Sequence, residues 1–164
     1  MFLPLAFAAL VPAAAAGASA AEVRPCPGFA SGRANPVEVH RFYVRRVISI
    51  VNAAAAEDLA ALDALVSPEA SLEIWRGDYS VGGREPGRAV AIEMVRILRP
   101  VRYQSQIGQP GPISVLSTIC THEVTLLFRT EEPTVGFSMT FNFRDGVMVS
   151  ATGSEVALFE GGLP

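Results

Sequence analysis

The sequence predicts an α+β fold, in which three N-terminal helices pack on one face of a strongly curved, mainly antiparallel sheet. Apolar residues recur at helical spacing between about residues 36 and 98, apart from one short strand, and with a period of two from about residue 101. Asp145-Gly146 separates two alternating segments, which indicates a tight hairpin. A group of helices followed by a group of antiparallel strands is typical of an α+β domain.

The first 21 residues are uncharged, and Ala18-Ser19-Ala20 forms a small-x-small cleavage site. We therefore expect a signal peptide over residues 1–20, cleaved near Ala20, and a periplasmic or secreted protein without a membrane span after cleavage. The n-region lacks Lys and Arg, and the alternative is an uncleaved anchor, since about 20 apolar residues can span a bilayer. Residues 21–34, rich in Pro, Gly and Ala, should form an extended lead-in to one domain over residues 35–160.

The chain has two cysteines, Cys26 and Cys120, whose state depends on the compartment. In an oxidising compartment the cysteines of a small domain usually pair, so export predicts a disulfide that fastens the lead-in to the domain. The alternative is two free thiols, with Cys120 buried as a small apolar residue. The spacing is not that of a structural zinc site, and we expect no metal.

The composition argues against several classes of function. The formal net charge is −3, whereas nucleic-acid binding needs a basic surface. All 13 basic residues are Arg, so the chain has no Lys to form a Schiff base. We expect no cofactor and no nucleic-acid partner.

The first helix should begin at Asn35-Pro36 and run to about Ala55. Asn35 suits the N-cap, Pro36 the first helical position and Glu38 the capping box. One helical stripe is polar and should face solvent: Glu38, Arg41, Arg45, Ser49 and Asn52. The opposite stripe, with Tyr43 on its flank, is predicted to be buried: Val37, His40, Val44, Val47 and Val51.

A second helix is expected from about Asp58 to the helix-ending pair Ser67-Pro68. A short strand over residues 71–75 should follow it. Arg76 and Asp78, which come directly after this strand, are expected to be solvated.

The glycine-rich segment VGGREPG, residues 81–87, precedes a third helix from about Arg88 to Leu98. A phosphate cradle needs free backbone N–H groups and often a Lys. Here Pro86 removes one donor and Glu85 adds negative charge. The segment is therefore predicted to be a turn rather than a nucleotide site.

The second half of the chain is predicted to form the sheet. A strand is expected over residues 101–107. A strand near residues 115–130 places one set of residues on a single face: Cys120, His122, Val124, Leu126 and Phe128. The strand after it has an apolar face of its own: Val135, Phe137, Met139, Phe141 and Phe143.

A tight turn at Asp145-Gly146 would set the register of the last hairpin. Phe143 would then face Met148, Phe141 would face Ser150, and Met139 would face Thr152. The last strand is therefore expected to contribute Ser150, Thr152 and Ser154 to the apolar face.

Two helices, the segment SPEASLEIW, a Gly-containing loop, the segment GRAVAIEMV and a run of antiparallel strands follow one another over residues 36–159. This order resembles the nuclear transport factor 2-like superfamily, which includes SnoaL-like proteins and ketosteroid isomerase. The resemblance implies a cystatin-like cone, with a bent sheet wrapped around three helices and a pocket at the open end. It also implies a homodimer through the outer face of the sheet.

In ketosteroid isomerase, an Asp just after the first short strand is the general base, and a Tyr on the first helix helps to hold the oxyanion. Tyr43 matches that Tyr. The segment ASLEIW places Ile74 at the Asp position and Glu73 one residue earlier, where a side chain points to the other face. The resemblance therefore implies the fold without an intact isomerase base.

Polar and aromatic residues expected to face inward are the remaining candidates for a site. His40, Tyr43 and His122 could form an acid–base group, since both histidines fall on apolar faces. The alternative is that each His only packs and bonds to a backbone carbonyl. The predicted ligand pocket, for which core packing is the alternative, has an aromatic rim and an apolar floor: Trp75, Tyr79, Tyr103, Phe137, Met139, Phe141, Ser150 and Thr152.

Three functions fit these observations. The favoured one is an exported domain that binds a small apolar or amphipathic molecule without converting it. The second is an enzyme of the isomerase, cyclase or hydrolase kind that uses the two His and Tyr43. The third is a dimeric scaffold whose useful surface is the outer face of the sheet.

Overall fold

The computed structural model describes residues 36–83, 85–105 and 121–158. The expected signal peptide, the extended lead-in, Cys26 and Cys120 lie outside these residues. Within them the helices are α1 (Pro36–Ala55), α2 (Leu59–Leu65) and α3 (Arg88–Leu98). The strands are β1 (Val66–Arg76), β2 (Tyr79–Val81), β3 (Arg102–Ser105), β4 (Thr121–Arg129), β5 (Val135–Arg144) and β6 (Val147–Ala157).

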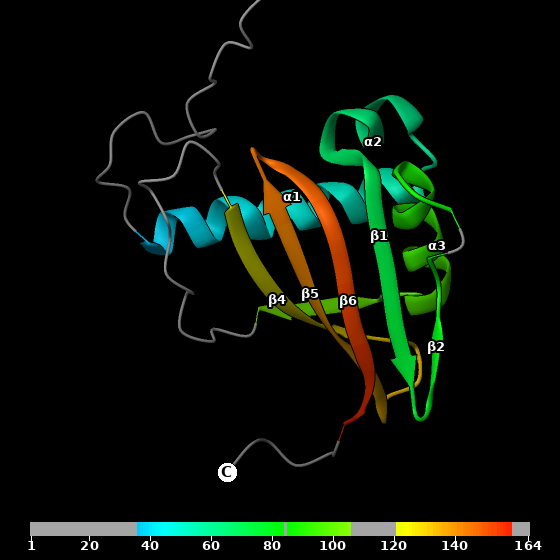
Figure 1. The fold of residues 1–164 in the computed structure, drawn as a ribbon. Coiled ribbons are helices and arrows are strands. Elements are labelled where there is room, and N and C mark those ends of the chain that lie inside the picture. Colours follow the sequence, from blue (N-terminus) through cyan, green and yellow to red (C-terminus); the bar gives the residue numbers. More distant parts are fainter. Residues whose placement is uncertain (1–35, 84, 106–120, 159–164) are drawn as a thin grey trace, which may run out of the picture.

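The strands form one curved sheet in the order β2-β1-β6-β5-β4-β3. β1 pairs with β6 in parallel, and the other neighbouring strands are antiparallel. Figure 1 shows α1 crossing behind β4, β5 and β6, with α3 beside β1 and β2. Helices on one face of a bent, mainly antiparallel sheet confirm the predicted α+β cone.

The buried stripe of α1 is rotated from the one predicted. The predicted polar stripe is exposed throughout, but Val37 is 53% exposed and His40, Val44 and Val51 are only half-buried. Tyr43, predicted on the flank, lies at the centre of the stripe that packs on the sheet: Val39, Tyr43, Val47, Ile50 and Ala54. Both stripes are apolar at helical spacing, so contact with the sheet selects between them.

The first strand is longer than predicted and begins directly after α2. Asp58 caps α2, and its Oδ1 accepts a hydrogen bond from the N–H of Ala61 at 3.0 Å. β1 then begins at Val66, five residues before the predicted strand, and therefore contains Ser67-Pro68. Its pairing with β6 is irregular between Val66 and Ser71, which accommodates Pro68, a residue without an N–H to donate.

The glycine-rich segment is a turn between β2 and α3, as predicted. Gly82, Gly83 and Gly87 all have positive φ, with values of 94°, 80° and 77°. The N–H of Gly83 donates to Oε2 of Glu93 at 3.0 Å, and the N–H of Gly87 donates to the carbonyl of Ala70 at 3.1 Å. Two of the backbone donors that a phosphate would need are therefore already bonded within the chain. The predicted bounds of the third helix agree with α3.

The central strands β4 and β5 alternate as predicted. His122 lies opposite Phe143 at one end of the pair, and Phe128 lies opposite Phe137 at the other end. The side chains on the inner face are buried against the helices: His122, Val124, Leu126, Phe128, Phe137, Met139, Phe141 and Phe143.

The predicted register of the last hairpin is wrong beyond its first pair. Phe143 does face Met148, but a bulge between Asn142 and Phe143 then shifts β6 by one residue. Because side chains alternate along a strand, the shift turns Ser150, Thr152 and Ser154 to the outer face.

Gly153 takes an inner-face position in β6, opposite Met139. A Cβ at Gly153 would collide with the carbonyl oxygen of Ser138 and with the Met139 sulfur. The bulge therefore places a glycine at the inner-face position where the core has no room for a side chain.

Candidate functional site

An aromatic cluster joins α1 to the inner face of the sheet. Tyr43 stacks on His122 with ring centroids 4.6 Å apart, and it also contacts Phe143 at 4.9 Å. His40, one helical turn before Tyr43, approaches His122 edge-on at 6.2 Å. The predicted acid–base group of His40, Tyr43 and His122 is therefore brought together by the fold.

Burial controls the charge of this cluster. His122 is 8% exposed, and its Nε2 is buried without a hydrogen-bond partner in the described part of the chain. Desolvation, with a smaller contribution from His40, lowers the pKa of His122 to about 4. Desolvation also raises the pKa of Tyr43; Arg46 opposes this rise and Asp145 adds to it. Both rings are therefore neutral near pH 7, and His122 is a weak base there.

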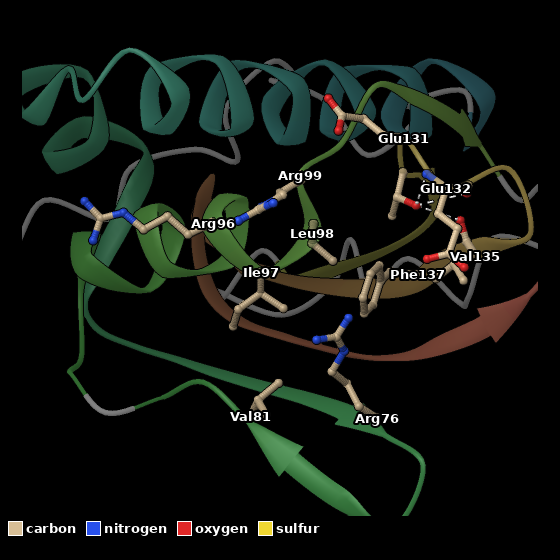
Figure 2. A pocket seen from close by; sticks show the side chains of 11 residues that line it. Arg76, Val81, Arg96, Ile97, Leu98, Arg99, Glu131, Glu132, Val135 and Phe137 are labelled. Atoms are coloured by element: carbon tan, nitrogen blue, oxygen red, sulfur yellow. Dashed lines mark hydrogen bonds between the residues drawn. The ribbon is translucent and has the colours of Figure 1, made fainter.

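A cavity of about 440 Å³ opens at the other end of β4 and β5 (Figure 2). Its walls come from the β1–β2 hairpin, the C-terminal end of α3, the β4–β5 turn and the start of β5. The lining residues are Arg76, Val81, Arg96, Ile97, Leu98, Arg99, Thr130, Glu131, Glu132, Val135 and Phe137. Apolar side chains thus share the cavity with charged ones, and its volume lies in the usual range of small-molecule sites.

Arg76 is the most firmly held cation of this cavity. Its Nε donates to Oε2 of Glu155 at 2.8 Å, and its guanidinium carbon lies 5.5 Å from the centre of the Phe137 ring. The register of β1 and β6 places Arg76 beside Glu155. Trp75 pairs with Ser154 on the outer face, and because side chains alternate, the next residues, Arg76 and Glu155, lie on the inner face.

The other charged groups at the opening differ in their partners. Arg96 forms an ion pair with Glu57 at 3.1 Å, outside the cavity. Arg99 ends α3 in a left-handed conformation, with φ at 40°, and makes no ion pair among the described residues. Glu131 and Glu132 lie in the β4–β5 turn. The Thr130 hydroxyl orders this turn, since it lies 3.1 Å from the carbonyl oxygens of both Glu132 and Val135, between which its single proton is shared, and it accepts the N–H of Glu132.

The aromatic cluster and the cavity are separate places in the fold. His122 and Phe128 are six residues apart on β4, which corresponds to roughly 20 Å of strand. Phe128 pairs with Phe137, which lines the cavity, so the two sites occupy opposite ends of the same strands. The three candidate catalytic residues do not line this cavity.

A second hollow, of about 560 Å³, lies at the cluster end of the sheet. His122 and Phe143 reach it from the inner face, and its other lining residues are Thr121, Glu123, Asn142, Arg144 and Val149. Most of these alternate with the core residues of β4 and β5, so the hollow runs around the end of the sheet rather than into the cone.

The residues of the predicted ligand pocket are not brought together in one place by the fold. Phe137 is the predicted residue that lines the inner cavity. Met139 and Phe141 are fully buried in the core, while Trp75, Tyr79 and Tyr103 are 44%, 61% and 51% exposed and do not line it. Ser150 and Thr152 point to the outer face because of the bulge.

The arginines of the cavity were not predicted as site residues. The side chain of Arg76 is 40% exposed, in agreement with the expected solvation, but it also lines the cavity. One signal could have found Arg76. Leu72, Ile74 and Arg76 are spaced by two residues, so Arg76 continues the buried face of the strand. A charged residue at the end of a buried face indicates the rim of a pocket. Arg99 had no comparable signal, because its position depends on how α3 ends.

The structure also places the two residues that the resemblance sets at or beside the position of the isomerase Asp. Ile74 is fully buried at the expected Asp position, and Glu73 is exposed opposite Thr152 on the outer face. Among the described residues there is no group of three or more His, Cys, Asp or Glu placed to hold a metal ion. None of the described helices is long and apolar enough to cross a membrane.

The chain matches no protein-family model and no curated protein sequence. A solved structure similar to it is an NTF-2-like protein of unknown function from Silicibacter pomeroyi, with 11% identity, a TM-score of 0.47, and coverage of 75% of this chain and 100% of that chain. An NTF2-like protein of unknown function from Shewanella baltica has 12% identity, a TM-score of 0.47, and coverage of 75% and 98%.

A cystatin-like fold protein from Burkholderia xenovorans has 15% identity, a TM-score of 0.44, and coverage of 74% and 95%. The likeness is one of fold. The α+β cone is evident from the chain's own sheet order and helices, and a fold by itself does not define a function.

Proposed function

We propose that this domain binds a small amphipathic molecule in the cavity between the β1–β2 hairpin, the end of α3 and the β4–β5 turn, without converting it. The observation that supports this most directly is the combination of apolar walls, formed by Val81, Ile97 and Phe137, with the anchored guanidinium of Arg76. Apolar walls with a few placed polar groups are the usual make-up of a ligand site.

The enzyme alternative has less support. Its candidate base, His122, has a pKa of about 4 and is therefore poorly matched to proton transfer near pH 7. The cavity lies at the other end of the strands, and its lining carries Arg and Glu but no His or Tyr. A binding role needs only the shape and polarity that the cavity has.

A titration of ¹⁵N-labelled protein with 1-octanol and with sodium octanoate tests this proposal. We expect amide shifts at Val81, Ile97 and Val135 that saturate with ligand. Ile97→Trp should fill the cavity and abolish the shifts, whereas Leu127→Trp adds the same bulk on the outer face and should leave them unchanged. Shifts that are scattered over the surface, or that are equal in both variants, would contradict the proposal.

A further inference from the structure

The guanidinium of Arg76 has only part of its hydrogen-bonding capacity in use. Its Nε is bonded to Glu155, and one face lies over Phe137. The two terminal nitrogens have no partner among the described residues. Figure 2 shows them directed toward the cavity, between Ile97 and Phe137. The side chain is 40% exposed, so a ligand can reach these donors.

We propose that the ligand of this cavity is a monocarboxylic acid with a short apolar body, whose carboxylate binds the two terminal nitrogens of Arg76. This inference rests on the proposed binding function and names its ligand class. The planar guanidinium presents two parallel donors that match the two oxygens of a carboxylate. Glu155 and Phe137 hold the guanidinium in one orientation, so little side-chain entropy is lost when the acid binds.

The charges around the opening favour a single negative charge on the ligand. Arg96 forms an ion pair with Glu57, and Arg76 forms one with Glu155. Among the described lining residues, Arg99 is therefore the cation without an ion pair. Glu131 and Glu132 stand on the opposite wall and would repel a phosphate dianion. An amine would instead face the like charge of Arg76.

The apolar residues set where the body of the acid lies. Val81 comes from β2, Ile97 and Leu98 come from the end of α3, and Phe137 forms the wall beneath the guanidinium. Leu98 and Phe137 are already buried in the protein, so the carbon chain of an acid bound to Arg76 would bury the half-buried side chains of Val81, Ile97 and Val135.

Three probes of one chain length separate charge from shape: octanoate, 1-octanol and octylamine. Their affinities are measured by NMR titration at pH 7 on the full chain, on Arg76→Gln, on Arg76→Lys and on Arg88→Gln. Arg88 is the matched control, because it pairs with Asp63 at a site that does not line this cavity. Thermal unfolding of each variant verifies that the fold is retained.

We expect octanoate to bind the unmodified protein at least tenfold more tightly than octanol or octylamine. Arg76→Gln should remove this preference, Arg76→Lys should restore only part of it, and Arg88→Gln should keep it. If octanol binds as tightly as octanoate and Arg76→Gln changes neither, the carboxylate inference is wrong while the binding function stands. If no probe shifts the cavity amides, the binding function itself is wrong. Preference for octylamine would also overturn the inference.

Discussion

Tyr43 and His122 stack with their ring centroids 4.6 Å apart and an angle of 24° between their planes. The pair links α1 to β4, and both side chains are buried. Burial is the main cause that lowers the pKa of His122, and His40, whose ring centroid lies 6.2 Å away, lowers it further. The cluster packs α1 against β4, and we expect this contact to weaken when His122 is protonated.

The stability of the fold should depend on the protonation of His122. Its pKa falls from 6.5 in the unfolded chain to about 4 in the folded state, so between these values the unfolded chain binds more protons. Stability should be greatest above pH 6.5 and should fall on acidification toward pH 4, by up to about 3 kcal/mol. Urea unfolding at a series of pH values measures this slope.

His122→Phe provides the control for the acid sensitivity. This variant keeps a ring against Tyr43 and removes the titrating group. The free energy of unfolding should therefore change less steeply with pH between pH 4 and 6.5. His40→Phe should reduce this slope less, since His40 is the smaller cause of the shift. An unchanged slope in His122→Phe would assign the acid sensitivity to other groups.

Gly153→Ala should destabilise the fold by about 1–3 kcal/mol, because the added methyl group overpacks the core. It would meet the carbonyl oxygen of Ser138 and the sulfur of Met139. Ser154→Ala, on the outer face of the same strand, should cost less than about 0.5 kcal/mol. Chemical unfolding measures both; equal stabilities of the two variants would contradict the register that places Gly153 inward.

Glu93→Ala should loosen the turn before α3. The Glu93 carboxylate accepts the N–H of Gly83 at 3.0 Å, and loss of such a bond costs about 1 kcal/mol. Hydrogen exchange at Gly83 should accelerate, with little change in the β4–β5 core. Glu93→Gln keeps an acceptor and should recover most of the protection; exchange that is equally fast in both variants would argue against this bond.

Self-association of the protein should depend on the outer face of the sheet. Thr140, at its centre, bonds to Thr125 with 3.0 Å between hydroxyl oxygens, and we expect a second copy of the chain to cover this surface. Thr140→Arg should convert the dimer to a monomer in analytical ultracentrifugation. Arg88→Gln, on a helix, should leave the dimer intact. A monomer at all concentrations in the unmodified protein would rule out the predicted dimer.

Export and disulfide formation are predicted from the sequence and can be read from one mass spectrum. The protein produced in a bacterial periplasm with its own leader should lose residues 1–20. Its mass should also lack two hydrogens if Cys26 and Cys120 pair, and reduction should restore them. Retention of the leader would favour the anchor, and an unshifted mass on reduction would favour free thiols.

Periodicity alone predicted much of the fold. The bounds of α1 and α3, the inward residues of β4 and β5, and the hairpin at Asp145-Gly146 all follow from repeats of apolar residues and from turn chemistry. These features are local, since each depends on residues that are close together in the chain. The turn formed by the glycine-rich segment was predictable for the same reason.

The site was much less predictable, because it depends on contacts between distant segments. A single bulge beside Phe143 reversed the facing of Ser150 and Thr152. The cavity wall joins residues from the β1–β2 hairpin, the end of α3 and the β4–β5 turn, and no spacing in the sequence connects them.

By itself, the sequence determined the class of fold and the burial of His122 on an apolar strand face, because side-chain alternation and helical repeat follow directly from backbone geometry. Only the tertiary structure decided that Tyr43 packs on His122 and that Arg76 is anchored between Glu155 and Phe137. Those contacts depend on strand register and on the rotation of α1, which are selected by packing of the whole core.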